Sequence, residues 1–219
     1  MNEIIYKDLK IYHLIKRTLK HSYITIKHND GEVIILVKTP SSSEIFVKKL
    51  IKEKESWIRK QLSKYANLKF QKITLGKEVL IFGKLHKIDD IEVKELKMML
   101  DNISESSKIE KSYDEFYHII AKHYMVKRVE YFATIMQLTF NDLKFKKLKS
   151  RWGSCNSNGV IVLNTQILKH KKELIEYVIV HELAHLVHMN HSKEFHNLVD
   201  RYIDDSKRKR KELKRVLLT

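Results

Sequence analysis

The chain has 219 residues, of which 43% are hydrophobic, and it carries a formal net charge of +16. This is enough for one domain or two small domains with buried cores, and a single proline with five glycines argues against long flexible linkers. One cysteine excludes an intramolecular disulfide and favours a reducing, cytoplasmic setting. Residues 1–7 are too charged for a signal peptide, and no run approaches the roughly 18 apolar residues of a membrane span.

The first half of the chain predicts a β-rich region with one helix. Alternating apolar residues over 23–27 and 33–37, with the turn-forming pair Asp30-Gly31 between them, predict a hairpin. Helical periodicity runs from Glu44 to about Tyr65, after serines that can cap a helix. Further short strands are predicted at residues 73–75, 79–82 and 88–93.

The second half predicts more helix. A polar stretch over residues 102–112 places the boundary so that residues 1–105 form one region and residues 106–219 the other. A long amphipathic helix is expected from Tyr113 to about Met136. Strands at 143–148 and 160–163 then lead to a further helix.

That helix contains the string His181-Glu182-Leu183-Ala184-His185, which has the spacing of a catalytic zinc site. Strands that lead into a helix with this motif suit the layout of zincin-type peptidases, in which a sheet edge can hold an extended peptide. The predicted fold class is therefore α+β, with an N-terminal β-rich half and a C-terminal zincin-like half. Two histidines four residues apart lie on one face of a helix, about 6 Å apart along its axis, so both imidazoles can bind one ion. Glu182 is rotated by about 100° from His181, which directs its carboxylate toward a water molecule, the position of a general base. The apolar run over residues 174–180 predicts that this helix is buried.

The third ligand has to come from a region with several histidines. His188 lies on the same stripe as the first two, but in an unbroken helix it would be about 10 Å along the axis from His181. If the helix ends near residues 188–190, the chain can turn and bring His191 to the metal. We therefore predict His191 as the third ligand. His196 falls in a probable next helix that starts near Ser192, where it can line the cleft, although His188 and His196 are equally well explained as partly exposed polar residues.

These residues resemble a known family. Arg151-Trp152-Gly153-Ser154-Cys155, the HELAH string and Asn190-His191-Ser192 with Glu194-Phe195 are similar to the YgjP-like zinc metallopeptidases, and less specific matches occur in the first half. The resemblance implies Zn²⁺ bound by His181, His185 and His191, Glu182 as the base, and kinship with SprT-like and WLM-type peptidases, some of which act on proteins attached to DNA. One departure is His196, where the family usually has an aromatic residue.

The string at residues 151–155 has no obvious chemical role in the sequence. We interpret Trp152 as core, Gly153 as a bulge or a position of close approach, and Cys155 as a small buried residue, with a thiolate ligand as the lesser alternative. Arg151 fits an ion pair or the stabilisation of an oxyanion. Residues that hydrogen-bond to the ligand histidines cannot be identified from the sequence. Asp200, Asp204 and Asp205, on or near the next helix, are candidates, but solvated surface carboxylates are the favoured interpretation of all three.

Three functions compete. A zinc-dependent peptidase acting on a peptide or protein is favoured, because a glutamate after the first histidine is needed for hydrolysis and not for metal binding. A metal-dependent nucleotide pyrophosphatase is the first alternative, but no glycine-rich phosphate loop supports it. A nucleic-acid-binding module with a structural zinc is the second. The basic cluster at residues 207–211 suits weak nucleic-acid contact, but lysine predominates over arginine, the better reader of phosphates and bases, and no aromatic residues are interleaved.

Overall fold

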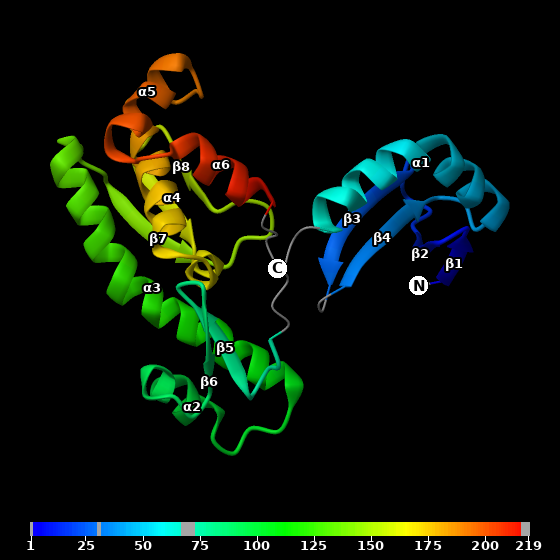
Figure 1. The fold of residues 1–219 in the computed structure, drawn as a ribbon, viewed down its shortest axis with the longest axis horizontal. Coiled ribbons are helices and arrows are strands. Elements are labelled where there is room, and N and C mark those ends of the chain that lie inside the picture. The colour runs from blue at the N-terminus through cyan, green and yellow to red at the C-terminus, as the bar shows by residue number, and fades with distance from the viewer. Residues whose placement is uncertain (1, 30–31, 67–72, 216–219) are drawn as a thin grey trace. The chain divides into compact units, whose positions relative to one another are not determined.

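The computed structural model describes residues 2–29, 32–66 and 73–215. Contacts between residues divide the chain into two units, essentially residues 1–72 and 73–214, and each unit has its own hydrophobic core (Figure 1). The predicted boundary after residue 105 falls inside the second unit, in the short polar segment between helices α2 (Lys94–Leu100) and α3 (Ser106–Met136).

The first unit is a four-stranded sheet covered by one helix. Its strands are β1 (Asn2–Tyr6), β2 (Leu9–Ile15), β3 (Tyr23–Asn29) and β4 (Glu32–Thr39), in the order β1-β2-β4-β3. The outer pairs are antiparallel, and the central pair of β2 and β4 is parallel. Helix α1 (Glu44–Ala66) buries Val47, Ile51 and Ile58 in the core of this unit, and their spacing places them on one face of the helix.

Most predictions for this unit are confirmed. The predicted hairpin is the antiparallel pair of β3 and β4, and the predicted helix from Glu44 is α1. The turn pair Asp30-Gly31 lies outside the described residues. Sequence analysis missed β1 and β2, although Leu9, Ile11 and His13 alternate toward the interior as a half-buried strand requires.

The second unit begins with a small hairpin of β5 (Glu78–Ile81) and β6 (Lys84–Lys87), whose tight turn uses Gly83 at φ 77°. The strand predicted at 79–82 is confirmed as β5, but those at 73–75 and 88–93 are wrong. Residues 73–75 lead into a turn in which Gly76 has φ 81°. Residues 88–93 form a turn followed by the 3₁₀ helix η1 (Ile91–Val93), because the Asp90 carboxylate accepts a hydrogen bond from the Lys87 N–H and fixes the turn.

Helix α3 and a three-stranded sheet form the frame of the second unit. The predicted helix from Tyr113 is confirmed, and it starts earlier, at Ser106. Strands β7 (Asp142–Lys146), β8 (Gly153–Cys155) and β9 (Val160–Asn164) lie in the order β7-β9-β8, with β7 parallel and β8 antiparallel to the central β9. The predicted strands correspond to β7 and β9, whereas the short edge strand β8 was not predicted.

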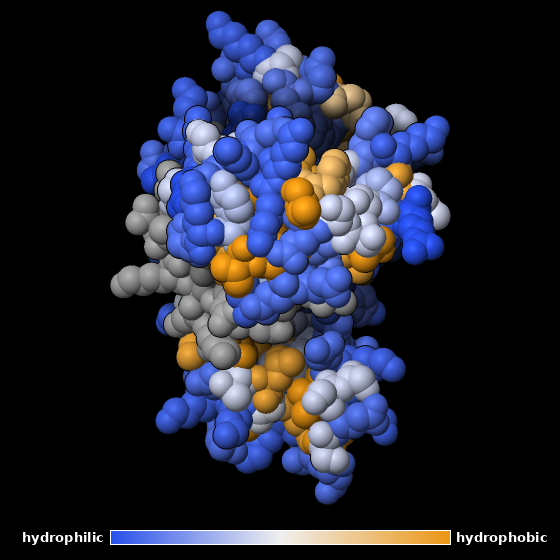
Figure 2. All heavy atoms as spheres, turned by 90° about the vertical axis from the view of Figure 1, so that its right-hand side faces the viewer, coloured by the Kyte–Doolittle hydropathy of each residue, from blue (hydrophilic) through white to orange (hydrophobic). Residues whose placement is uncertain are grey.

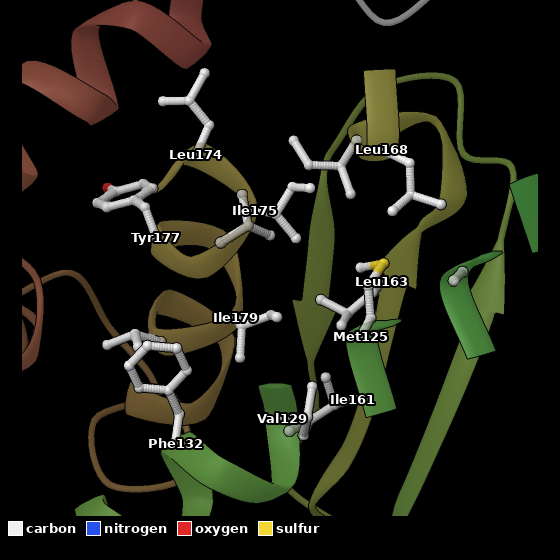
Figure 3. Close-up of a cluster of buried hydrophobic side chains, with 14 of the residues drawn as sticks. Met125, Val129, Phe132, Ile161, Leu163, Leu168, Leu174, Ile175, Tyr177 and Ile179 are labelled. Atoms are coloured by element: carbon white, nitrogen blue, oxygen red, sulfur yellow. The ribbon is translucent and has the colours of Figure 1, made fainter. Parts of the chain in front are cut away.

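The helix that carries the histidine motif is packed into this frame. After β9 the chain forms the 3₁₀ helix η2 (Thr165–Lys169) and then α4 (Lys172–Ala184), α5 (Lys193–Tyr202) and α6 (Ser206–Arg215). Ile175 and Ile179 of α4 point toward Leu163 of β9 and toward Met125 of α3, and all four are buried (Figure 3). Because protein interiors are close-packed, this contact fixes the position and rotation of α4.

The surface is mainly hydrophilic. On the face drawn in Figure 2, hydrophilic side chains predominate and apolar side chains are scattered among them, as expected from 43 lysines and arginines in the chain. Within the described ranges, no helix is both long enough and apolar enough to cross a membrane.

Candidate metal centre

The C-terminal end of α4 places two of the predicted ligands. His181 lies in the last turn of the helix, and His185 directly follows its last residue, Ala184, still with right-handed helical dihedral angles. The two rings are 5.0 Å apart between centroids. The helix then ends in a tight turn, in which the N–H groups of Leu186 and Val187 donate to carbonyls three residues earlier. The helix therefore ends at Ala184, earlier than the predicted end near residues 188–190, and the predicted turn after it is found.

The turn after α4 returns His191 to the other two histidines. Ser192 caps α5, as its Oγ accepts a hydrogen bond from the Phe195 N–H at 3.3 Å. His191, just before this cap, has its Nε2 3.0 Å from Nε2 of His181. One ligand atom from each of His181, His185 and His191 lies within 4.8 Å of the others. The structure thus brings together the three histidines that the sequence singled out.

Other candidate ligands lie outside this group. His188 contributes its main-chain carbonyl, which accepts a hydrogen bond from Nδ1 of His185 at 3.0 Å. His196 stacks on His191 with ring centroids 6.2 Å apart, and its Nε2 accepts a hydrogen bond from the Arg210 guanidinium at 3.1 Å. Cys155 is a free, half-buried thiol that does not belong to the group. Asp200 accepts a hydrogen bond from the Ser206 hydroxyl rather than from a histidine.

The surroundings of the histidines leave ring nitrogens available for a metal. Because a carbonyl can only accept, Nδ1 of His185 donates the bond to His188, and Nε2 is the nitrogen of that ring available to a metal. Burial lowers the pKa of His181 to about 3, with further lowering by the neighbouring histidines, so this imidazole is neutral at pH 7. Burial also lowers the pKa of His191. A neutral imidazole is the form that binds a metal, so the donor set fits a divalent cation of the zinc type.

Glu182 lies beside the three histidines and packs against a glycine of strand β8. Only 6% of Glu182 is exposed, although it carries a carboxyl group. A Cβ atom on Gly153 of β8 would lie 2.7 Å from both Cγ and Oε1 of Glu182, which is closer than real contacts allow. The predicted close approach at Gly153 is thus found, and its partner is Glu182. Burial raises the pKa of the Glu182 carboxyl to about 8, and the positive charge of Arg151 acts in the opposite direction.

Phe195 is a residue of the site whose role sequence analysis missed. It is fully buried, and its ring centroid lies 4.8 Å from that of His181, 4.6 Å from that of His185 and 4.9 Å from that of His191. One aromatic ring therefore packs against all three imidazoles and limits their rotation. The available signal was its position three residues after the helix cap Ser192, in a helix with few other apolar residues.

Asn164 connects the site to the sheet. Its side chain is fully buried at the end of β9, where Nδ2 donates to the carbonyls of Leu148 and Arg151 at 2.9 and 3.0 Å. Its Oδ1 accepts a hydrogen bond from the Gln166 N–H at 3.1 Å. These bonds hold the loop that leads into β8, and β8 contains the glycine beside Glu182.

A cavity of about 310 Å³ opens beside the histidines within the second unit. Its wall includes His181, Glu182 and His191. The wall also includes residues of the 151–155 string and of helix α6. The described residues that line it are Arg151, Trp152, Gly153, Tyr177, Val178, His181, Glu182, His191, Arg210, Leu213 and Lys214. The sequence showed a basic cluster at residues 207–211, but not that the helix containing it lines the site.

The comparisons with known proteins define the class. The model of the YgjP-like metallopeptidase domain matches residues 20–216, so the chain belongs to the YgjP-like family of metallopeptidases, which are metal-dependent hydrolases of peptide bonds. The recognised family is thereby confirmed. A comparison with curated proteins found no match.

Two solved structures are similar over part of the chain. One is the metallopeptidase zymogen of Pyrococcus abyssi abylysin, with 22% identity and a TM-score of 0.37. The other is the metallopeptidase zymogen of Methanocaldococcus jannaschii jannalysin, with 24% identity and a TM-score of 0.35. Each match covers 40% of this chain and 89% of the other.

Proposed function

We propose that this protein is a zinc-dependent peptidase in which His181, His185 and His191 bind the zinc ion and Glu182 is the general base. The observation that carries the proposal is the convergence of three imidazoles next to a buried carboxyl group. Imidazole nitrogens suit zinc, and three protein ligands leave a position open for catalysis, whereas a structural zinc site has four. When bound there, zinc supplies a Lewis acid that activates water and polarises a carbonyl.

Glu182 moves the proton. Its carboxylate oxygen accepts a proton from the attacking water and returns it to the nitrogen of the leaving amine. A carboxyl group with a pKa raised toward neutrality by burial suits both steps, and a nearby divalent cation would favour its ionised form. The backbone of β8 at Gly153 lies against this carboxyl group and limits its movement.

The substrate we propose is an extended peptide or a segment of a protein. Strand β8 lies at the edge of its sheet, and its outer edge has no partner strand in the described part of the chain. Such an edge binds an extended peptide through main-chain hydrogen bonds. Because β8 also contains Gly153, a peptide on this edge would lie beside Glu182 and the histidines. The single free cysteine favours a reducing, cytoplasmic setting for this activity.

The first test is the metal content of protein purified without chelator, measured by elemental analysis. We expect about one zinc per chain, loss of the metal in His191→Ala, and its retention in the control His188→Ala, because the His188 main-chain carbonyl remains. Wild-type protein without metal, or equal loss in both variants, would contradict the ligand assignment.

The second test separates metal binding from catalysis. Glu182→Gln should keep the zinc and lose hydrolysis of internally quenched peptides by about 10²-fold or more, since the amide cannot accept the proton. A fully active Glu182→Gln variant would refute the role of Glu182. Hydrolysis of nucleoside triphosphates without hydrolysis of any peptide would favour the pyrophosphatase function instead.

A further inference from the structure

The cavity beside the histidines has an unusual balance of charge. Among the described residues that form its wall are three basic residues, Arg151, Arg210 and Lys214, and one acidic residue, Glu182. The ion pairs found within the described residues of the second unit include none of the three basic side chains. Glu182 balances at most one of the three positive charges, so the cavity has a positive potential that favours an anionic ligand.

The helix that carries two of these three residues, Arg210 and Lys214, is held in position. Helix α6 is anchored by Leu213, which is buried in the core of the unit, and by the Lys209 ammonium, which donates to the Asp204 carbonyl. The Arg210 guanidinium donates one hydrogen bond to Nε2 of His196 at 3.1 Å. Since a guanidinium has five N–H donors in a planar fork, this bond orients the group and leaves donors for a ligand.

The apolar part of the wall strengthens this attraction. Trp152 packs partly against the core, and Val178 and Leu213 are buried. Low-polarity walls reduce the screening of charges, so a hydrogen bond between a cation and an anion counts for more here than on an open surface.

The size of the cavity indicates which anion it accepts. A volume of about 310 Å³ lies at the lower end of the range for small-ligand pockets and holds one or two side chains. A nucleic-acid duplex does not fit such a space, and its phosphates would meet the exposed face of α6 instead. A carboxylate fits, and a planar guanidinium fork matches its two oxygens.

We propose that this cavity binds a carboxylate of the peptide substrate beside the scissile bond, through Arg210, Lys214 and Arg151. The inference rests on the proposed peptidase function and specifies its substrate class as peptides with a carboxylate beside the scissile bond. The carboxylate comes either from an aspartate or glutamate side chain or from the C-terminus of the peptide. The two sources share the same chemistry and are separated by experiment.

The first experiment measures kcat/KM of the zinc-loaded full-length protein on internally quenched peptides. Pairs of peptides differ only by glutamate or glutamine at one position, and the position is moved along the peptide. A further pair differs by a free or an amidated C-terminus. We expect a preference of at least about tenfold for the carboxylate, the size of a charge-assisted hydrogen bond, in one of these series. Equal rates in every pair would overturn the inference while leaving the peptidase function intact.

A matched pair of variants tests which cations are responsible. Arg210→Gln with Lys214→Gln removes two charges from the cavity wall. Lys207→Gln with Lys211→Gln removes two charges from exposed positions of the same helix that do not line it. The ratio of kcat/KM for the carboxylate peptide to kcat/KM for its uncharged partner should fall toward one in the variant with Arg210 and Lys214 replaced. The ratio should keep its wild-type value in the variant with Lys207 and Lys211 replaced. A similar fall in both would show that the general charge of α6, and not the cavity, produces the preference.

Charge reversal gives an outcome that misfolding cannot produce. At the peptide position where glutamate is preferred over glutamine, Lys214→Glu should favour lysine instead. The ratio of kcat/KM for the lysine peptide to that for the glutamate peptide should rise by about tenfold or more. An unchanged order of substrates in a folded Lys214→Glu protein that retains its zinc would exclude Lys214 from the site.

A binding measurement keeps the inference independent of turnover. Fluorescein-labelled glutamate and glutamine peptides are titrated with zinc-loaded Glu182→Gln protein, and binding is followed by anisotropy. Tighter binding of the glutamate peptide supports the carboxylate site even if the wild-type protein hydrolyses no peptide, a result that would refute only the proposed function. Equal affinity for both peptides, or displacement of the glutamate peptide by a short single-stranded DNA, would overturn the carboxylate assignment.

Discussion

Gly153→Ala tests whether close approach of a strand positions the general base. The added Cβ would lie 2.7 Å from Cγ and Oε1 of Glu182 and 2.9 Å from its Cδ, whereas ordinary van der Waals contact begins at 3.4 Å. Glu182 or β8 must therefore move by roughly 0.7 Å, the difference between those distances. A misplacement of about 1 Å in a catalytic group costs on the order of 10²-fold in rate. Overpacking of a buried site costs about 1–3 kcal/mol of stability.

We therefore expect Gly153→Ala to lose about 10²-fold in kcat for peptide hydrolysis while retaining one zinc per chain, because the three atoms nearest to the added Cβ all belong to Glu182 and none to a histidine. The assay is single-turnover hydrolysis of a quenched peptide, with metal content and thermal unfolding measured on the same samples. Ser154→Ala, the neighbouring substitution on β8, is the control and should remain within about threefold of wild type. Wild-type activity in Gly153→Ala would refute the idea that this contact sets the position of Glu182.

Three further predictions concern the surroundings of the site. Phe195→Ala should lower the free energy of unfolding by about 3–5 kcal/mol and weaken zinc binding in a chelator competition, since the ring packs against all three imidazoles. Asn164→Ala should cost about 1–3 kcal/mol in denaturant unfolding, because the carbonyls of Leu148 and Arg151 lose their donor and the buried Gln166 N–H loses its acceptor. Burial lowers the pKa of His170 from 6.5 to about 4, so the unfolded protein takes up this proton at a higher pH than the folded protein. The free energy of unfolding should therefore fall as the pH drops from about 6.5 to 4. Over the same pH range, the melting temperature of His170→Asn should depend less on pH than that of the wild type.

The residues brought together at the site were largely predictable, because their positions follow from helix geometry. His181 and His185 are four residues apart, and Glu182 follows from the same helix. His191 was predictable as a ligand only because the helix was expected to end before it. Asn190 and the capping residue Ser192 indicated that end. Whether these residues bind zinc and catalyse hydrolysis stays a prediction.

The surroundings of the site were not predictable, because they depend on contacts between segments distant in sequence. The contact of Gly153 with Glu182 joins residues separated by a strand and a helix. Arg210 and Lys214 lie in a helix whose sequence indicates only a solvated basic face. One strand was predicted wrongly because of a side-chain contact. The 88–93 segment has the β-branched apolar residues typical of a strand, but the Asp90 carboxylate accepts a hydrogen bond from the Lys87 N–H and closes a turn there.

The 151–155 string contributes its backbone beside Glu182, in addition to the Arg151 side chain that we propose for the carboxylate site. Asn164 holds the carbonyl of Arg151, and β8 then continues antiparallel to β9 with Gly153 against Glu182. If the free edge of β8 binds the substrate as we propose, one strand fixes both the peptide and the carboxyl that takes the proton. Their relative position then depends on a single rigid element, and no motion of a lid is needed to align them. It follows that loosening this strand, as in Asn164→Ala, should lower kcat more than it raises KM, because a misaligned peptide can still bind along the edge.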